Sequence, residues 1–374
     1  DAYWHRQPGT RKDLALKNGG THETEQAVER GLAYLARQQF ADGHWALNEF
    51  PDTSDPAYQQ ASPGEMDADT AATGLALLAY LGAGYTHKDG QWQRQVRIGL
   101  NWLRAHQGPD GSLYSPDTDT TQSARMYGHG IAAIALCEAY GMTRDPELRE
   151  PAERAIRFIV DAQNPQLGGW RYVPRLESDT SVSGWHLMAL TSARLAGLDV
   201  PPETLEGVRR WLDFAEKQDG AKYVYNPNAS NDPSQKHGRD PNLPMTAEGL
   251  LMRLYLGWES NEPGMVSGAD YLAANVPQMG TEGDAQRDVY YWYLASQVMF
   301  QMQGDHWNKW NAAMRPLVLE DQLTQGPLAG SWSPTEPVVD RWAHAGGRHY
   351  QTTLHLLMLE VYYRYLPIYD MLDD

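Results

Sequence analysis

The chain of 374 residues has a single cysteine, Cys137. One thiol cannot form an internal disulfide, and it cannot supply the several cysteines of a structural zinc site. Basic residues are also few, since 31 Lys and Arg stand against 48 Asp and Glu for a net charge of −17. Nucleic acids and anionic membrane surfaces bind clustered Lys and Arg, so the charge argues against nucleic acid and against an anionic surface as the main partner.

Long apolar runs are missing as well. No run approaches the 18 apolar residues of a membrane-spanning helix, and no signal-peptide pattern is present. We therefore expect a soluble chain without a transmembrane segment. Peripheral membrane contact, the compartment, and a leader or anchor upstream of Asp1 stay open. Phe is scarce (5), whereas Tyr (21) and Trp (13) are abundant. Their rings carry polar tips, which suit a cavity wall as well as a core.

What the chain does contain is a repeat. An amphipathic helix ends in an aromatic–Leu pair that is followed by Gln, Gly and an aromatic residue, as in Tyr34-Leu35, Gln39, Gly43 and Trp45. Other copies, several of them degenerate, centre on Trp102-Leu103, Phe158-Ile159, Trp211-Leu212, Tyr271-Leu272 and Leu317-Val318. Between the copies lie helices that are apolar around most of their circumference, which is typical of buried helices. These are residues 69–83, 127–141, 179–197, 245–257, 288–303 and 349–366.

Six amphipathic helices alternating with six buried helices predict an all-α (α/α)6 toroid of six outer and six inner helices. One pair cannot bury its apolar face alone and needs neighbours. A linear solenoid is the alternative, but the last buried helix is as apolar as the middle ones and no polar capping repeat follows it. Residues 1–20 lack periodicity and are predicted to form an N-terminal arm. Residues 21–374 are predicted to form a single toroid domain of six helix-pair repeats.

Loop lengths predict where the toroid carries its function. The connections from outer to inner helices are long and the reverse connections are short. The long loops should therefore gather at the end where the inner helices begin, and long loops on a rigid scaffold usually carry function. We expect the mouth of a cavity there. The polar stretch 226–243 is expected to be a surface insertion beside this mouth, with a lid as the alternative.

The repeat resembles the QW motif of the terpene cyclase and prenyltransferase toroids, squalene-hopene cyclases included, over about residues 24–366. We expect Trp45, Trp170 and Trp332 to pack between repeats. The resemblance implies a class II terpene cyclase that cyclises a linear isoprenoid after protonating it. It implies no cofactor and no metal for a hydrocarbon or epoxide, and Mg²⁺ would enter only with a diphosphate substrate. The prenyltransferase zinc site needs an Asp where this chain has Ala135.

The segment Asp67-Ala68-Asp69-Thr70-Ala71 opens the first inner helix and resembles the acid motif of class II cyclases. On this resemblance Asp69 is the proton donor and Asp67 its helper. Two carboxylates in an extended segment at this spacing point the same way, and repulsion raises one pKa. Thr70 replaces the third Asp of the fuller motif, and in the other register Ala68 holds the acid position. The alternative is that Asp69, like Asp179 in its own helix, is an N-cap.

Aromatic and cationic side chains are predicted to line the cavity or its mouth. They are Tyr127, His129, Arg171, Tyr172, Asp179, Trp185, His186, Trp292, Arg348, His349 and Tyr350. Aromatic faces can hold a carbocation and can also stack on sugars. The Arg and His content exceeds what a hydrocarbon cavity needs. Two alternatives therefore stay open: a polysaccharide lyase or glycoside hydrolase on the same fold, and a toroid that binds a ligand or protein without catalysis. A closed apolar sac would favour the isoprenoid, an open polar groove the glycan, and a filled channel the binder.

Overall fold

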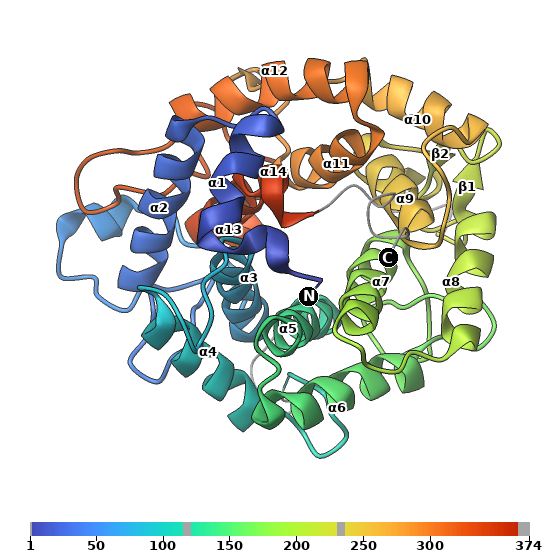
Figure 1. Ribbon diagram of the computed structural model, residues 1–374. Coiled ribbons are helices and arrows are strands. Elements are labelled where there is room, and N and C mark those ends of the chain that lie inside the picture. The colour runs from blue at the N-terminus through green and yellow to red at the C-terminus, as the bar shows by residue number, and fades with distance from the viewer. Residues whose placement is uncertain (1, 115–120, 230–235, 366–374) are drawn as a thin grey trace.

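The arrangement of helices follows the alternation of amphipathic and apolar segments. The computed structural model describes residues 2–114, 121–229 and 236–365. Figure 1 shows two concentric rings. The outer ring holds α2 (His22–Arg37), α4 (Gln93–Ala105), α6 (Pro146–Ala162), α8 (Pro202–Ala215), α10 (Pro263–Ala273) and α12 (Gly304–Glu320). The inner ring holds α3 (Asp69–Gly82), α5 (Gln122–Thr143), α7 (Thr180–Leu195), α9 (Leu243–Tyr255), α11 (Val289–Met302) and α13 (Ala343–Leu359).

The rings close. Each inner helix packs against the next, α13 packs against α3, and α12 packs against α2. The predicted (α/α)6 toroid is therefore confirmed. Burial follows position in the rings: α3 is buried from Thr70 to Gly82, whereas α4 buries only one stripe of four residues. The remaining elements are two hairpins of two-residue strands, β1 (Glu216–Lys217) with β2 (Lys222–Tyr223) and β3 (Gly280–Thr281) with β4 (Asp284–Ala285), and the short 3-10 helices η2 (Pro56–Gln60) and η3 (Lys236–Arg239).

The glutamines of the repeat join neighbouring outer helices. The Gln39 side-chain amide donates to the Gly43 carbonyl in its own loop (2.9 Å) and to the Gln95 carbonyl in α4 (3.0 Å). Gln107 and Gln163 make the same pair of bonds in the next two repeats. Gln322 donates to Gly330 (3.1 Å) and to Ala27 of α2 (2.9 Å). The last repeat is thereby tied to the first by the bond that links consecutive repeats elsewhere.

The tryptophans of the repeat lie where they were expected. Trp45, Trp170 and Trp332 are at most 1% exposed. Their indole N–H groups donate to carbonyls in the last turn of the preceding outer helix: Trp45 to Leu35 (2.7 Å), Trp170 to Ile159 (2.8 Å) and Trp332 to Val318 (2.8 Å). Each indole therefore donates to a carbonyl in the last turn of an outer helix while its ring packs between helices.

Glycine at position 330 offers a test of the seam between the last and first repeats. Gly330 has φ +96°, and a Cβ there would collide with the Arg30 carbonyl of α2. Gly326 in the same loop has φ +78° with open space around it. Both Ala substitutions carry the strain of a positive φ, about 1 kcal/mol or more. We expect Gly330→Ala to lower the free energy of unfolding by about 1–3 kcal/mol beyond Gly326→Ala, because only Gly330 is overpacked. Equal urea midpoints for the two variants would contradict this account of the seam.

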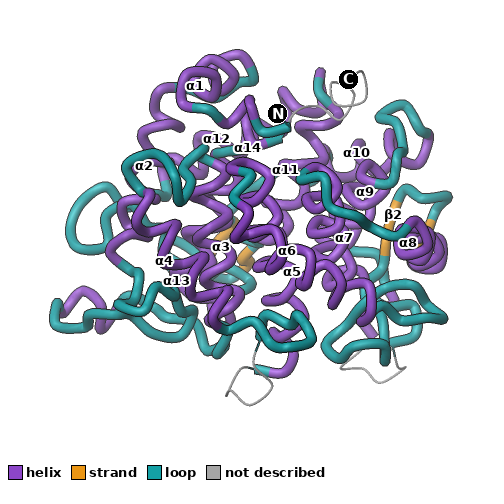
Figure 2. Tube along the Cα trace, turned by 60° about the horizontal axis from the view of Figure 1, so that its bottom comes forward, coloured by secondary structure: helices purple, strands orange, loops and turns teal. Residues whose placement is uncertain are grey.

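The N-terminal segment packs on the toroid. Residues 1–20, expected to form an arm, contain η1 (Trp4–Arg6) and α1 (Pro8–Lys17). Together with α14 (Val361–Arg364) they cover the end where the inner helices finish, opposite most of the long loops (Figures 1 and 2). Arg6 and Arg364 both pair with the buried carboxylate of Glu138 in α5, at 2.8 and 3.0 Å. A cavity of about 50 Å³ remains beneath this cover. Among the described helices, none has the length and apolarity needed to cross a membrane.

Candidate functional site

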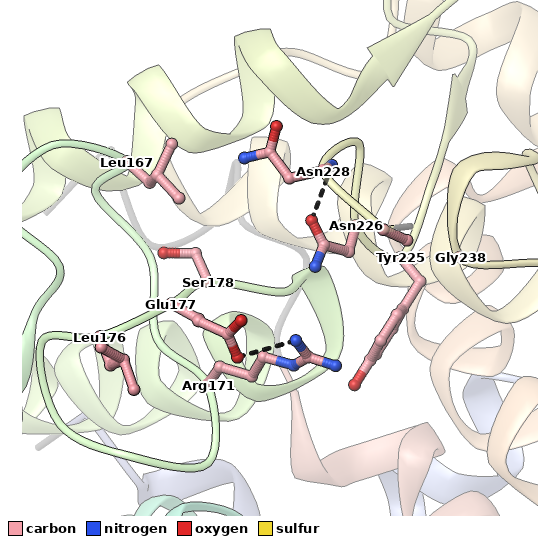
Figure 3. A pocket seen from close by; sticks show the side chains of 10 residues that line it. Leu167, Arg171, Leu176, Glu177, Ser178, Tyr225, Asn226, Asn228 and Gly238 are labelled. Carbon is pink, nitrogen blue, oxygen red and sulfur yellow. Dashed lines mark hydrogen bonds and ion pairs between the residues drawn. The ribbon is translucent and has the colours of Figure 1, made fainter. Parts of the chain in front are cut away.

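A pocket opens at the long-loop end, between the loop that precedes α7 and the loop that precedes α9 (Figure 3). Its volume is about 610 Å³. Its wall exposes polar and apolar surface in similar amounts, and it comprises Leu167, Arg171, Leu176, Glu177, Ser178, Tyr225, Asn226, Asn228, Ala229 and Gly238. Four of these residues, Asn226, Asn228, Ala229 and Gly238, come from the stretch predicted as a surface insertion, so that stretch forms part of the pocket wall.

Arg171 is held in the wall by its own loop. The Asp179 amide donates to the Trp170 carbonyl (2.9 Å), which pins the two ends of the loop together. The Arg171 guanidinium then pairs with Glu177 at 2.8 Å, as Figure 3 shows, and lies 4.9 Å from the centre of the Tyr172 ring. The charge of Arg171 is therefore already neutralised within the protein. What it offers a ligand is a fixed set of N–H donors.

Asp179 lies directly behind this wall. It is fully buried, and its Oδ1 accepts from the Val182 amide (2.7 Å), so it is an N-cap, as its position suggested. Its Oδ2 accepts from the Tyr225 hydroxyl (3.0 Å) and lies 3.5 Å from Arg171 Nε. Burial raises the pKa of Asp179 to about 7, against the lowering effects of the Val182 amide, Arg171 and Tyr225. A carboxyl with this pKa exchanges a proton near neutral pH, which is the property of a general acid or base.

Several polar groups of the pocket are available to a ligand. The Ser178 hydroxyl lines the pocket, is buried and has no hydrogen-bond partner among the residues that the structure describes. Asn226 accepts from the Asn228 amide (2.9 Å), and the Asn228 side chain is exposed (Figure 3). Tyr225 presents a half-buried ring. Hydroxyl, amide and guanidinium groups around one ring form a wall that suits a ligand rich in hydroxyl groups.

A second buried cluster lies between the inner helices, next to Asp179. The Tyr290 hydroxyl donates to Glu248 Oε2 (2.6 Å) and is 2.8 Å from Ser181 Oγ. Ser181 also faces the Tyr127 hydroxyl. Burial raises the pKa of Glu248 well above its usual range, and Asp179 adds to the effect. Gly184 makes room for this carboxyl, because a Cβ there would collide with it.

Asp69 starts α3 at the same end of the toroid. The N-cap position is held by Ala68, and no side chain caps the helix, so the capping alternative for Asp69 is wrong. Its carboxylate lies 3.7 Å from His44 Nε2, and His44 Nδ1 lies 2.6 Å from Asp42. Burial raises the pKa of Asp69 to about 6 against the lowering effect of His44, and Asp67 adds to the increase. Its side chain is 34% exposed, so this acid is open to solvent.

The structure does not bring all the predicted residues to the pocket or to an open mouth. His129 was expected at the cavity, but it is a buried core residue. Its Nδ1 accepts from the Leu113 amide, and its Nε2 contacts the Ala155 carbonyl. The same correction applies to three more buried side chains. His186 stacks on Trp170, His349 contacts the Ala72 carbonyl, and Arg348 donates to the Ala61 carbonyl and Ser331. Each of these four side chains contacts at least one backbone carbonyl, and burial lowers the pKa of His129 to about 4 and of His186 to about 3.

Two predicted tryptophans are also core residues. Trp185 is stacked on Tyr293 at 5.9 Å, and Trp292 meets His355 edge-on at 6.5 Å. Both are at most 2% exposed, which corrects their assignment to the cavity wall. Tyr127, Tyr172 and Tyr350 stay partly exposed at the long-loop end, and Arg171 lines the pocket.

Sequence reasoning missed Tyr225, Asn226, Asn228, Glu248 and His44. For Glu248 a sign was present, because it is the only carboxylate within the apolar helix Leu243–Tyr255. For the others the sequence offers no comparable sign. A metal centre is not indicated either: within the described ranges, no three His, Cys, Asp or Glu side chains group as metal ligands would.

The fold and the pocket define the class: an (α/α)6 toroid with a pocket at its long-loop end. No protein-family model matches the chain. A squalene–hopene cyclase of Bradyrhizobium diazoefficiens is 26% identical over 204 residues. That match covers 48% of this chain and 28% of the cyclase, so the chain spans less than a third of that relative's length.

Two kinds of solved structure share the fold. An α-1,6-mannanase (GH76A) of Salegentibacter sp. HEL1_6, in complex with α-1,6-mannotriose, has a TM-score of 0.60 at 11% identity, over 90% of this chain and 98% of the mannanase. The type II terpene cyclase MstE from Scytonema, in complex with geranylgeranyl dihydroxybenzoate, has a TM-score of 0.57 at 14% identity, over 91% and 97%. At these identities the similarity establishes only the toroid fold. The chemistry has to be inferred from the residues of the site.

Proposed function

We propose that this toroid binds a glycan in the pocket at its long-loop end and hydrolyses a glycosidic bond with Asp179 as the proton donor. The observation that carries the proposal is a pocket of about 610 Å³ with polar side chains in its wall, backed by a buried carboxyl whose pKa is about 7. Pockets of a few hundred Å³ are the usual size for small-molecule sites. An isoprenoid needs an enclosed apolar chamber, whereas the described cavity between the inner helices is only about 50 Å³.

Glycoside hydrolysis in most families uses two carboxyl groups with different protonation states. Asp179 supplies the protonated one, which gives its proton to the oxygen of the leaving sugar. Glu177 is exposed and ion-paired to the same Arg171, and it supplies the carboxylate that activates water or stabilises positive charge on the sugar ring. Tyr225 lines the pocket and donates to Asp179, so the ligand reaches the acid by displacing this hydroxyl.

The experiment is a survey of products. The purified protein is incubated with linear neutral glycans and, separately, with linear isoprenoids, and the products are identified by mass spectrometry. Released shorter oligosaccharides support the proposal. Cyclised isoprenoids with intact glycans contradict it and support the second candidate below.

The second candidate is the class II cyclase. The observation in its favour is Asp69, a half-exposed acid with a pKa of about 6 at the start of α3, beside Asp67 and His44. The similarity to a squalene–hopene cyclase over about half of the chain points the same way. A group with this pKa is about one-tenth protonated at pH 7, which is enough for acid catalysis.

For this candidate the informative change is Asp69→Asn. Asparagine keeps the shape of the side chain and removes its transferable proton. If Asp69 initiates cyclisation, product formation from a linear isoprenoid should fall by at least about 100-fold, the low end for a general acid. Mass spectrometry of the products measures this, and circular dichroism checks that the toroid has formed. Wild-type levels of cyclised product from the folded variant would exclude Asp69 as the acid.

A further inference from the structure

Aromatic rings continue from the pocket across the long-loop end of the toroid. The Tyr225 hydroxyl is 2.6 Å from the Tyr172 hydroxyl, and the Tyr172 ring is 6.4 Å from the Tyr127 ring. Tyr290 bonds the Ser181 hydroxyl at 2.8 Å, and the same serine faces the Tyr127 hydroxyl, so one side chain of α7 lies between α5 and α11. The Tyr290 ring in turn meets Trp342 edge-on at 6.3 Å. These contacts form one row of rings from the pocket wall to the start of α13, in which Tyr290 is buried and the other rings are partly exposed.

Trp342 ends the row and is built as an exposed platform. It is 37% exposed, which is unusual for the tryptophans of this chain, most of which are buried. Its indole N–H donates to Asp288 Oδ1 (3.2 Å), and its backbone amide donates to Asp340 Oδ1 (2.8 Å). The Tyr290 ring supports it from within. A large apolar ring is therefore held in one orientation while part of its surface faces solvent.

We infer that the ligand is an extended, neutral oligosaccharide that runs from the pocket along this row, with Trp342 stacking on a distal sugar. The inference rests on the proposed function and specifies its substrate. The ligand must be longer than one sugar, because a single sugar in the pocket would leave Trp342 uncovered. Neutrality follows from charge: Arg171, the one Lys or Arg among the pocket residues, is already paired with Glu177 and Asp179. At the other end of the row, Arg341 lies 5.8 Å from the centre of the Trp342 ring, and its guanidinium is 3.9 Å from Asp288. The chain's net charge of −17 also disfavours an acidic polymer.

The test asks whether truncating Trp342 weakens the binding of a long glycan more than the binding of a short one. Isothermal titration calorimetry measures binding of α-1,6-mannobiose, α-1,6-mannohexaose, cellobiose and cellohexaose to the wild type and to Trp342→Ala. We expect Trp342→Ala to weaken binding of the hexaose by at least about tenfold and to leave the biose within about twofold. Trp342→Phe keeps a ring and should restore most of the hexaose affinity. Trp4→Ala, which removes a tryptophan that is 45% exposed at the opposite end of the toroid, is the matched control.

The outcomes separate this inference from the proposed function. If the wild type binds a hexaose and a folded Trp342→Ala binds it equally well, the extended site is refuted and the pocket remains. If Trp342→Ala melts at a lower temperature, its binding is measured well below that temperature, and unchanged hexaose binding there still refutes the site. Absence of binding to all four glycans overturns the proposed function with it. Binding of a linear isoprenoid that depends on Trp342 would assign the row of rings to the other substrate class.

Discussion

Replacing Asp179 with asparagine should leave the toroid folded and reduce glycan hydrolysis by at least about 100-fold. Asparagine caps a helix about as well as aspartate, so the bond to the Val182 amide is kept. The change removes the proton that the buried carboxyl holds near neutral pH. Initial rates on the glycan identified by the product survey measure the effect, and thermal melting checks the fold.

Asp145→Asn is the matched control. Asp145 caps α6, an outer helix, by bonding the Glu147 amide, and it does not line the pocket. The Asp145→Asn variant also loses an N-cap carboxylate, but one that lies outside the pocket. Its activity should therefore match that of the wild type. Equal activities of folded Asp179→Asn and Asp145→Asn would show that Asp179 only caps α7.

The pH profile gives an independent check on the same residue. The acid must be protonated to act, so wild-type activity should decline as pH rises through about 7, the pKa of Asp179. Stability changes in the same direction. The pKa of Asp179 is higher in the folded protein, about 7, than in the unfolded chain, 3.8. The protonated group therefore contributes its full stabilisation below pH 3.8, and this stabilisation is lost as pH rises through about 7. From about pH 4 to about pH 7, the wild type should therefore lose melting temperature relative to Asp179→Asn.

Truncation of Trp332 should cost about 3–5 kcal/mol of unfolding free energy, the usual loss for a buried aromatic cut to alanine. Trp332 is fully buried and stacks on His355 of α13 at 5.1 Å. Its indole N–H donates to the last turn of α12. The Ala variant therefore leaves a cavity between an outer and an inner helix and an orphan carbonyl at a helix end. Urea unfolding followed by circular dichroism measures the loss.

Trp4→Ala serves again as the control, because Trp4 is 45% exposed and its truncation should change the unfolding midpoint little. Glycan binding by Trp332→Ala, measured well below its melting temperature, should stay close to that of the wild type, since Trp332 does not line the pocket. An unchanged midpoint combined with lost binding would mean that Trp332 belongs to the ligand site and not to the scaffold.

The toroid could be predicted from the sequence because its cause is local. The stripe of α4 and the all-round apolarity of α3 are properties of short segments, and the alternation of the two kinds of helix is visible without coordinates. Gly43 and Gln39 mark the helix end in the same way, since a positive φ and a side-chain amide are needed wherever an outer helix stops. Closure of the ring was predicted from one further observation, namely that no polar capping repeat follows the last inner helix.

The site could be predicted only in part. Arg171 and Asp179 were among the residues proposed from the sequence, because loops before inner helices were expected at the mouth. Their partner Tyr225 comes from a different loop, and its hydrogen bond to Asp179 depends on how α7 and α9 pack side by side. His129 shows the opposite error. A histidine on an inner helix suggests a cavity, yet the neighbouring Leu113 and Ala155 backbone groups occupy both of its nitrogens.

By itself, then, the sequence determined the helices, their order, their inner or outer position and the end that carries the long loops, since each depends on periodicity or spacing within a segment. Only the tertiary structure decided which acids are buried and which rings are exposed. The pKa of Asp179 reaches about 7 because residues distant in sequence exclude water from it, while Asp69, in a similar sequence, stays partly exposed beside His44. Burial is set jointly by neighbouring helices and loops, so no single segment encodes it.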